Sequence, residues 1–481
     1  MVSRVDFSYT VTGNMSSGFV LKEARLIGVP RYMYPYINPE NMDADDTNDT
    51  NFPTDTLTTQ MFDREAIDVA NATAGSLTFY LPDNRRGVGA NTAATDAKLK
   101  AGLDNATAIQ LIGYKDGDEI TYNFYLGGDQ FNDYNLKRNT KYTLTADLDG
   151  TSTGDLRVTK SQAANTYLLK PGRSVLIPVK RANQSDLGEQ LADVSTGWTP
   201  VVLWRDNSAL DIAVTDTGNG VMEVTASNAT AEGNAVVYIK DGSDNVLWSW
   251  HVWVTNYDPQ SENDMYNGFT FMDRNLGALN DTKSGAGALG LLYQWGRKDP
   301  FVGSSDVSSA TLKTLYSGGS GSATFTSIST ATPSGSANNL IVVIRNPDVF
   351  YYSSSSPYDW YLGSSTKRND VLWGITKTVY DPCPAGWKVP PSSAFSSWDN
   401  PAYTWDTNGR SPSVANSWYP ATGKRSSNGV GLSSVGTDGY YWSSTPNGTR
   451  GTYLYFEENS VTKDRVGDRA YGFSVRCVQE N

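Results

Sequence analysis

Alternating apolar and polar residues dominate the first part of the chain. Between positions 5 and 12 the apolar residues are Val5, Phe7, Tyr9 and Val11, and the polar ones are Asp6, Ser8, Thr10 and Thr12. The stretch 141–150 repeats the pattern with Tyr142, Leu144, Ala146 and Leu148. Because successive side chains of a strand point to opposite faces, this period of two predicts half-buried antiparallel strands. We therefore expect a β-rich domain over residues 1–154.

Two further segments also favour strands. Residues 155–257 contain strand-like runs separated by turns at 170–172, 216–220 and 241–245, which predicts a small Ig-like β-sandwich. This segment has no cysteine, so a true immunoglobulin domain with its inter-sheet disulfide is excluded, and we expect a spacer. A polar linker at 255–267 leads to a third domain, residues 258–481. Its Ser/Gly/Thr-rich stretch 303–339 is expected to be a surface excursion.

Composition and charge narrow the classes of function. The 481 residues include 28 Tyr, 15 Phe and 13 Trp, and the net charge is -12. Such a charge argues against a nucleic-acid partner, because phosphate backbones bind basic surfaces. The longest aliphatic run, 340–344, is far shorter than the roughly 18 residues that span a bilayer. No signal peptide is visible at the start, so we expect either a cytoplasmic protein or, in better agreement with the motifs below, a sequence that lacks its leader.

The single histidine excludes most catalytic sites. A Ser-His-Asp or Cys-His site, or a zinc site with two histidines, needs imidazole groups that this chain lacks. His251 lies opposite the face that Trp248 and Val252 share in a strand-like run, so we interpret it as structural. Asp399 and Asp406 are carboxylates of the kind that glycosidases pair. Without a recognisable acid–base constellation, however, we expect no enzyme.

Several strings of the first segment occur in the order found in a known family. They are FYLPDNRRG at 79–87, YNFYLGGD at 122–129 and DYNLKRNTKYTLTADLDG at 133–150. Together they resemble the shell-domain strands of the fimbrillin-like subunits of Bacteroidota type V pili. The resemblance implies a transthyretin-like β-sandwich for residues 1–154. Subunits of that family usually carry two such domains, so an upstream domain is expected to be missing from this sequence.

The third segment resembles a second family more sharply. Its strings are MDRNLGA at 272–278, LYQWGRKDPF at 292–301, DPCPAGWKVP at 381–390, YWSST at 441–445 and GFSVRCV at 472–478. In this order they resemble the FISUMP (major paralogous) domain, which is related to C-type-lectin-like folds. The resemblance implies an α+β lectin-like domain over 258–481, with a short helix near 392–398. It also implies a closing strand that directs Phe473, Val475 and Cys477 inward.

The two cysteines, Cys383 and Cys477, leave two interpretations open. Isolated cysteines are usually buried thiols, but two of them can also form one long-range disulfide. In lectin-like folds a disulfide ties the first helical region to the last strand. The resemblance therefore implies that Cys383 and Cys477 form this disulfide.

Aromatic and polar residues gather between residues 398 and 419 and form a candidate ligand site. A sugar site without a metal needs aromatic faces for stacking and a few directed hydrogen-bonding groups. The candidates are Trp398, Asp399, Asn400, Trp405, Asp406, Trp418 and Tyr419. The alternative is that Trp398 and Trp418 belong to the core. The Glu-Pro-Asn, Gln-Pro-Asp and Trp-Asn-Asp triplets of calcium-dependent lectins are absent, so no motif supports calcium, and we predict neither metal ligands nor another cofactor.

These features together predict a pilus tip subunit at the cell surface, outside the outer membrane. It is expected to join a stalk or adaptor pilin by donor-strand addition, in which a strand of one subunit completes the sheet of another. Its lectin-like domain is expected to be an adhesin for a host or bacterial surface glycan or protein. A final strand that is locked into its own domain cannot be donated, which favours the distal end. The alternative is a cell-surface lipoprotein that does not polymerise.

Overall fold

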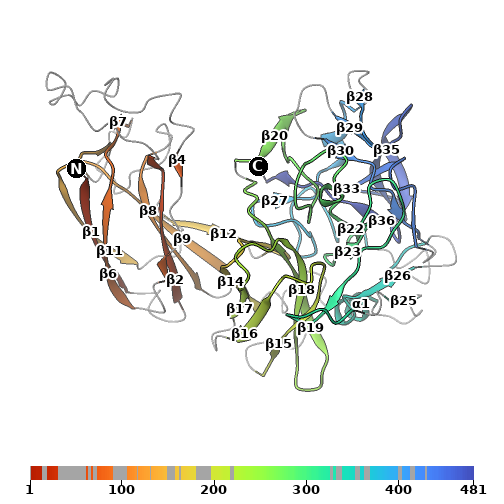
Figure 1. The fold of residues 1–481 in the computed structure, drawn as a ribbon, viewed down its shortest axis with the longest axis horizontal. Helices are drawn as coiled ribbons and strands as arrows, with labels where there is room; N and C mark the ends of the chain where they lie inside the picture. The colour runs from red at the N-terminus through yellow and green to blue at the C-terminus, as the bar shows by residue number, and fades with distance from the viewer. Residues whose placement is uncertain are drawn as a thin grey trace. The chain divides into compact units, whose positions relative to one another are not determined.

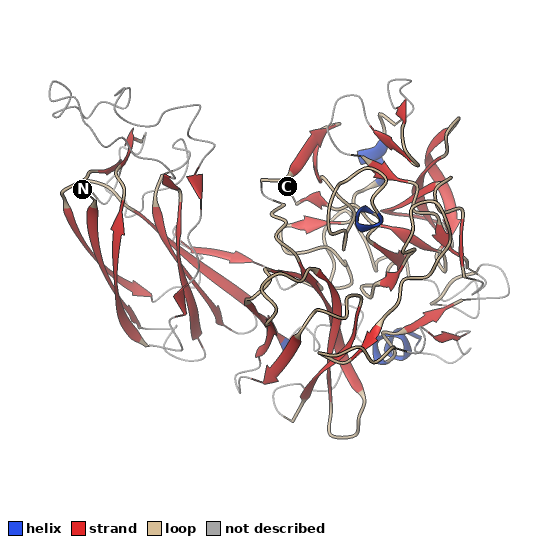
Figure 2. Cartoon of the chain, viewed as in Figure 1, coloured by secondary structure: helices blue, strands red, loops and turns tan. Residues whose placement is uncertain are grey.

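The computed structural model divides the chain into two compact units, Met1–Gln162 and Ala163–Asn481, called unit 1 and unit 2 below. The residues that the structure describes are 2–12, 19–30, 61–62, 67–68, 73–89, 106–115, 118–129, 132–148, 158–161, 164–179, 197–216, 221–259, 261–325, 329–331, 339–352, 358–361, 369–398, 404–411, 418–427 and 431–480. Strands dominate (Figure 2). α1 (Asn339–Arg345) is the one α-helix within these ranges, and the other helical pieces are 3-10 turns. The predicted mainly β, multidomain fold class is confirmed.

Unit 1 is a β-sandwich with an apolar core between two main sheets (Figure 1). One sheet has the strand order β11-β1-β6 and the other β12-β9-β8-β2-β5, and two small ladders pair β10 with β7 and β3 with β4. The strands are β1 (Ser3–Val11), β2 (Phe19–Ile27), β3 (Val29–Pro30), β4 (Met61–Phe62), β5 (Ile67–Asp68), β6 (Ala74–Leu81), β7 (Asn84–Val88), β8 (Ala108–Lys115), β9 (Asp118–Tyr125), β10 (Asp133–Leu136), β11 (Lys141–Leu148) and β12 (Val158–Ser161). Because β12 pairs with β9, the unit continues past the predicted boundary at residue 154.

Unit 2 begins with a second sandwich. A five-stranded sheet has the order β13-β19-β18-β15-β24, and a three-stranded sheet has the order β14-β17-β16. The strands are β13 (Thr166–Leu169), β14 (Ser174–Pro178), β15 (Thr199–Arg205), β16 (Ile212–Asp216), β17 (Val221–Ala226), β18 (Gly233–Lys240), β19 (Val246–Val254) and β24 (Tyr316–Ser317). The Ser/Gly-rich stretch predicted to be a surface excursion thus supplies β24 to this sheet. Its neighbouring carbonyls, at Ser317, Gly318 and Gly321, accept hydrogen bonds from the buried guanidinium of Arg205.

The rest of unit 2 contains two larger sheets and several short ladders. One sheet has the order β20-β21-β37-β27, and the other runs β23-β22-β36-β33-β34-β35 with β31 and β32 attached. The strands are β20 (Asn263–Tyr266), β21 (Phe269–Met272), β22 (Leu291–Gln294), β23 (Phe301–Val302), β25 (Ser329–Ala331), β26 (Val349–Tyr351), β27 (Trp387–Lys388), β28 (Thr404–Trp405), β29 (Gly409–Ser411), β30 (Tyr419–Pro420), β31 (Lys424–Arg425), β32 (Leu432–Ser433), β33 (Gly439–Asn447), β34 (Arg450–Phe456), β35 (Val461–Asp468), β36 (Gly472–Ser474) and β37 (Val478–Gln479). The helix expected near 392–398 is a short 3-10 turn, Ser392–Phe395.

The predicted spacer, 155–257, shares its cores with the segment that follows. On one face of β19, Trp248 and Trp250 belong to a core that also contains Val343 and Ile344 of α1. On the other face, Trp253 belongs to a core that also contains Trp295 and Trp442. A layer therefore covers each face of the sheet, and residues 163–257 and 258–481 form one compact unit instead of a spacer and a separate domain.

Buried hydrogen bonds join the same two segments of unit 2. The side-chain amide of Asn165 donates to the carbonyls of Val379 at 2.7 Å and Asp381 at 2.8 Å. The amide of Asn234 donates to the carbonyl of Gly277 at 2.9 Å. Polar groups buried away from water need such partners, so these bonds fix the position of one segment on the other.

His251 lies within this contact and is held neutral. Its Nε2 is 2.9 Å from Oδ1 of Asn234, and because the nitrogen of that amide donates to Asp206 and Gly277, the oxygen accepts and Nε2 carries the proton. Burial lowers the pKa of His251 to about 3. The histidine therefore has the structural role predicted for it.

We expect the contribution of His251 to the stability of unit 2 to decrease as the pH falls from about 6.5 toward 5. The unfolded histidine takes up a proton near pH 6.5, whereas the folded one does so near pH 3, so the unfolded state binds more protons in this window. This contribution to the free energy of unfolding should decrease by up to about 1.4 kcal/mol per pH unit. Urea titrations between pH 7 and pH 5 measure this slope.

The variant His251→Gln is the control for this pH dependence. Burial raises the pKa of Asp359 to about 6, so that carboxyl group stabilises the folded state toward acid pH and opposes the histidine. Both proteins contain Asp359, and its contribution cancels in the comparison. The free energy of unfolding of the unaltered protein should therefore fall relative to that of the variant as the pH drops, and parallel pH dependences would contradict a buried neutral His251.

Candidate functional site

The first strand of unit 1 occupies an unusual place, between two strands that do not pair with each other. β1 runs parallel to β11, with Val5 opposite Tyr142 and Tyr9 opposite Ala146. It runs antiparallel to β6 along its other edge, with Val5 opposite Phe79. Without β1, the facing backbone groups of β6 and β11 would therefore have no ladder partner, and we call this place the β1 slot.

Three alternate side chains anchor β1 in its slot. Val5, Phe7 and Tyr9 are 0%, 1% and 3% exposed and belong to the core between the two sheets. The ring of Tyr9 lies directly over Gly75 of β6, where an added Cβ would come within 2.7 Å of the ring carbon Cζ. The slot therefore offers a series of apolar pockets, and Gly75 makes the last one deep enough for an aromatic ring.

The outward face of β1 carries polar contacts instead. Asp6 accepts a hydrogen bond from Arg4 at 2.8 Å and one from Thr78 at 3.0 Å, and it lies 3.0 Å from the ammonium of Lys141. These contacts, the one with Arg4 first, lower the pKa of Asp6 to about 2. The site is solvent-exposed, so the ion pairs favour the position of β1 only weakly.

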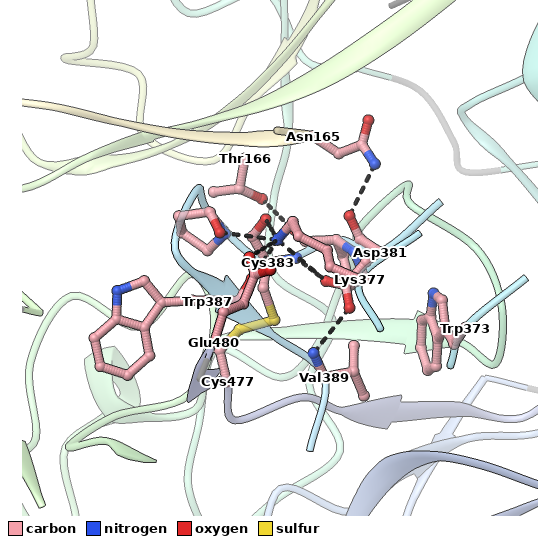
Figure 3. The surroundings of a disulfide bond; sticks show 12 residues. Asn165, Thr166, Trp373, Lys377, Asp381, Cys383, Trp387, Val389, Cys477 and Glu480 are labelled. Atoms are coloured by element: carbon pink, nitrogen blue, oxygen red, sulfur yellow. Dashed lines mark hydrogen bonds and ion pairs between the residues drawn. A yellow bond between two sulfur atoms is a disulfide. The ribbon is translucent and has the colours of Figure 1, made fainter. Parts of the chain in front are cut away.

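Cys383 and Cys477 form a disulfide, the pairing that the lectin-like resemblance implies (Figure 3). Both residues are fully buried in the core that contains Trp387, Val475 and Phe473. Phe473, Val475 and Cys477 thus point inward as predicted. The expected closing strand is split into β36 and β37, which lie in different sheets, so the disulfide fastens the 381–390 turn to the point where the two sheets meet.

Two charged side chains hold the turn that carries Cys383. The carboxylate of Asp381 accepts hydrogen bonds from the backbone N–H of Cys383 at 2.8 Å and of Val389 at 2.9 Å. The ammonium of Lys377 donates to the carbonyls of Cys383, Pro384 and Trp387 (Figure 3). These bonds satisfy charges that are almost completely buried, and they indicate a structural role for this cluster.

The structure places the predicted ligand residues in two different environments. Trp398, Trp418 and Tyr419 are at most 2% exposed, and Trp398 and Tyr419 belong to a core with Phe456 and Tyr441. Their rings are therefore not available for stacking on a ligand. They are core residues, which was the alternative interpretation for Trp398 and Trp418. Trp405 is half-buried and packs edge-on against Phe456. Asp399 and Asn400 lie outside the described residues.

Asp406 is a partly exposed member of the predicted ligand residues. Its carboxylate is 2.6 Å from the ammonium of Lys283, and both side chains are 46% exposed. The hydrogen bond from Lys283 lowers the pKa of Asp406. Its backbone carbonyl accepts a hydrogen bond from the indole of Trp418 at 3.0 Å. Trp398, Trp418 and Tyr419 thus lie in the protein interior, whereas Asp406 forms an ion pair at the surface.

Neither metal ligands nor a membrane span are found in the described parts of the chain. No group of three or more His, Cys, Asp or Glu side chains there is arranged to hold a metal ion. Likewise, none of the helices within the described ranges has the length and apolar character needed to cross a bilayer.

Sequence reasoning missed two basic residues of β31, Lys424 and Arg425. The ammonium of Lys424 lies 4.9 Å from the ring centre of Tyr440 and 5.1 Å from that of Tyr471. Arg425 is 5% exposed and lies 5.3 Å from the ring centre of Phe350. No local sequence pattern indicates which cations lie against aromatic rings from other parts of the chain.

Comparisons with known proteins give one family match and two distant structures. Residues 79–146 match a domain of unknown function, DUF4906, a family found in fimbrillin-like proteins of Bacteroidetes. No curated protein matches significantly. The full-length major pilin SpaD from Corynebacterium diphtheriae shares 8% identity over 51% of this chain and 63% of its own, with a TM-score of 0.13. The major pilin from Streptococcus pyogenes shares 10% identity over 50% of this chain and 83% of its own, with a TM-score of 0.11. Scores this low carry no argument about fold or function.

Proposed function

We propose that this protein is a fimbrial subunit that accepts a strand from a neighbouring subunit in its β1 slot. The observation that carries the proposal is the position of β1 between β6 and β11, with alternating apolar side chains in the core. A second strand with the same alternation would make the same backbone ladders and fill the same pockets. The family match at 79–146, which spans part of β6 and most of β11, supports this role.

Unit 2 is proposed to be the adhesive part, at the distal end of the fibre and without catalytic activity. Strands β36 and β37 lie in the middle of two sheets, so these two strands are not free to be donated to another subunit. The Cys383–Cys477 disulfide supports export, because disulfides persist in oxidising compartments. The ligand of this unit is a surface glycan or protein, as the lectin-like resemblance implies.

Strand exchange in a nicked protein tests the acceptor role. A protease site inserted between β1 and β2 allows the folded chain to be cut, which leaves β1 held by non-covalent contacts only. We expect a labelled peptide of residues 2–12 to replace the cut strand and to form a complex visible by native mass spectrometry. A peptide with Phe7→Ser and Tyr9→Ser should fail, because it places two hydroxyls in apolar pockets.

The same assay then identifies the partner. Peptides from the final strands of co-expressed pilins should enter the slot and raise the melting temperature of unit 1, because a ligand that binds only the folded state stabilises it. If no peptide replaces the cut strand at saturating concentration, the acceptor role is refuted. That result would favour the lipoprotein that does not polymerise.

A further inference from the structure

Arg425 is a largely buried cation, and its guanidinium makes no hydrogen bond to any described residue. It is 5% exposed, and its Nε is shielded from solvent with nothing to accept its hydrogen. Seven other largely buried arginines within the described ranges each donate hydrogen bonds to carboxylate, amide or carbonyl oxygens. They are Arg138, Arg205, Arg274, Arg297, Arg410, Arg469 and Arg476.

The backbone and one aromatic ring fix the position of Arg425. β31 pairs with β36 through Arg425 and Gly472, and with β32 through Arg425 and Leu432. A Cβ on Gly472 would come within 3.0 Å of the Arg425 Cβ and 3.2 Å of the Phe350 ring. The side chain is therefore packed tightly at its base, and the Phe350 ring lies 5.3 Å from the guanidinium carbon.

This arrangement is unfavourable for the folded protein by itself. Removing a charge from water is costly unless hydrogen bonds or an opposite charge compensate, and a contact with an aromatic face restores only part of that loss. Burial lowers the pKa of Arg425 to about 10, so the guanidinium still carries its charge at neutral pH. A methionine would fill the same volume without this penalty, and a buried unpaired charge is therefore typical of a binding site.

We propose that Arg425 anchors a binding site for a carboxylate group on an acidic sugar. A guanidinium presents its N–H donors in a planar fork that matches the two oxygens of a carboxylate. Lys424, the neighbouring residue of β31, lies over Tyr440 and Tyr471, and adjacent residues of a strand face opposite ways. A single guanidinium fits an anion with a single charge.

The class of ligand follows from the charge of the whole protein. The chain carries a net charge of -12, which repels polyanions such as nucleic acids or acidic peptides. A sugar acid has one carboxylate on an otherwise neutral frame, so it is repelled much less than a polyanion. The choice of a sugar over another carboxylate rests on the proposed adhesive function of unit 2.

Sodium glucuronate is the probe, and glucose with sodium chloride at equal ionic strength is its matched control. In the full chain, glucuronate at about ten times its Kd should raise the melting temperature of unit 2 by about 2 °C, and glucose should not. The variant Arg425→Met should weaken glucuronate binding about 10- to 100-fold in calorimetric titrations. Without ligand, the same variant should melt at or above the temperature of the unaltered protein.

The variant Arg410→Met separates this role from a structural one. Arg410 is 7% exposed, but its guanidinium donates to the carbonyls of Glu457 and Glu458. Its replacement should therefore lower the melting temperature and leave the response to glucuronate intact. An Arg425→Met protein that melts lower without ligand, or an unaltered protein that ignores glucuronate, would overturn the proposal. An equal response to N-acetylglycine would overturn the assignment to a sugar, and none of these results depends on strand exchange in unit 1.

Discussion

A chain that lacks residues 163–257 should lose the cooperative unfolding transition of residues 258–481. The deletion removes four buried side chains from the core around Trp295 and Trp442, namely Trp204, Val236, Trp253 and Tyr257. Lost burial of this size is worth on the order of 6–12 kcal/mol. Because domains are stable by only about 5–15 kcal/mol, the remaining segment should not fold. Calorimetry and near-UV circular dichroism measure the outcome.

Deletion of residues 1–162 provides the matched control for this experiment. It removes unit 1 as a whole and leaves both cores of unit 2 complete, so the melting transition of 163–481 should persist. If residues 258–481 alone melt cooperatively at a temperature near that of unit 2, the shared cores contribute little, and the predicted spacer is a separate domain.

The second large effect should come from the disulfide. Replacing Cys383 and Cys477 together by serine opens a loop whose ends are 94 residues apart, and the chain-entropy model assigns such a loop about 4–5 kcal/mol. We expect the melting temperature of unit 2 to fall by roughly 10 °C. Reduction of the unaltered protein should have a similar effect once the buried bond is reached.

Unit 1 serves as the internal reference for the disulfide measurement. Both cysteines lie in unit 2, so the melting transition of unit 1 should not change in the variant. The prediction fails if both transitions move together. It also fails if mass spectrometry finds two free thiols in the oxidised, exported protein.

The sequence alone was sufficient for local strand geometry. The alternation around Phe7 and Tyr9 correctly predicted which side of β1 is buried, and the lectin-like resemblance correctly implied that Phe473 and Cys477 point inward. The parallel pairing of β1 with β11 could not be predicted in this way. It joins residues that are far apart in the chain, and a period of two identifies a face but not a partner.

The cores that residues 163–257 share with residues 258–481 could not be predicted from the pattern of single strands, for a related reason. The pattern of β19 places Trp248 and Trp250 on one face, as observed, and marks the face with Ser249 and His251 as polar. That face is buried because residues of the following segment cover it and satisfy its polar groups, as Lys298 does by donating to the carbonyl of Ser249 at 3.0 Å. Polarity indicates exposure only when no second layer supplies hydrogen bonds.

The candidate ligand patch shows the limit of composition as evidence. Trp398 and Trp418 have the aromatic surface that sugar sites use, but the same surface makes large side chains effective core residues. In the structure they are 0% and 2% exposed. Arg425, by contrast, has no distinctive sequence neighbours, and only its three-dimensional surroundings show that its buried Nε lacks a hydrogen-bond acceptor.

The central position of β36 and β37 sets an order of folding events during synthesis. These strands follow every other described strand of unit 2 in sequence, yet β36 pairs with β22 and β37 with β21, which both lie near the start of residues 258–481. The ribosome therefore delivers them after the strands that they join, and neither sheet has its middle until the rest of unit 2 has been made. Contacts between residues so distant in the chain also make the closure of unit 2 slow. Unit 1, whose described strands all lie in the first 162 residues, can close while unit 2 is still being synthesised.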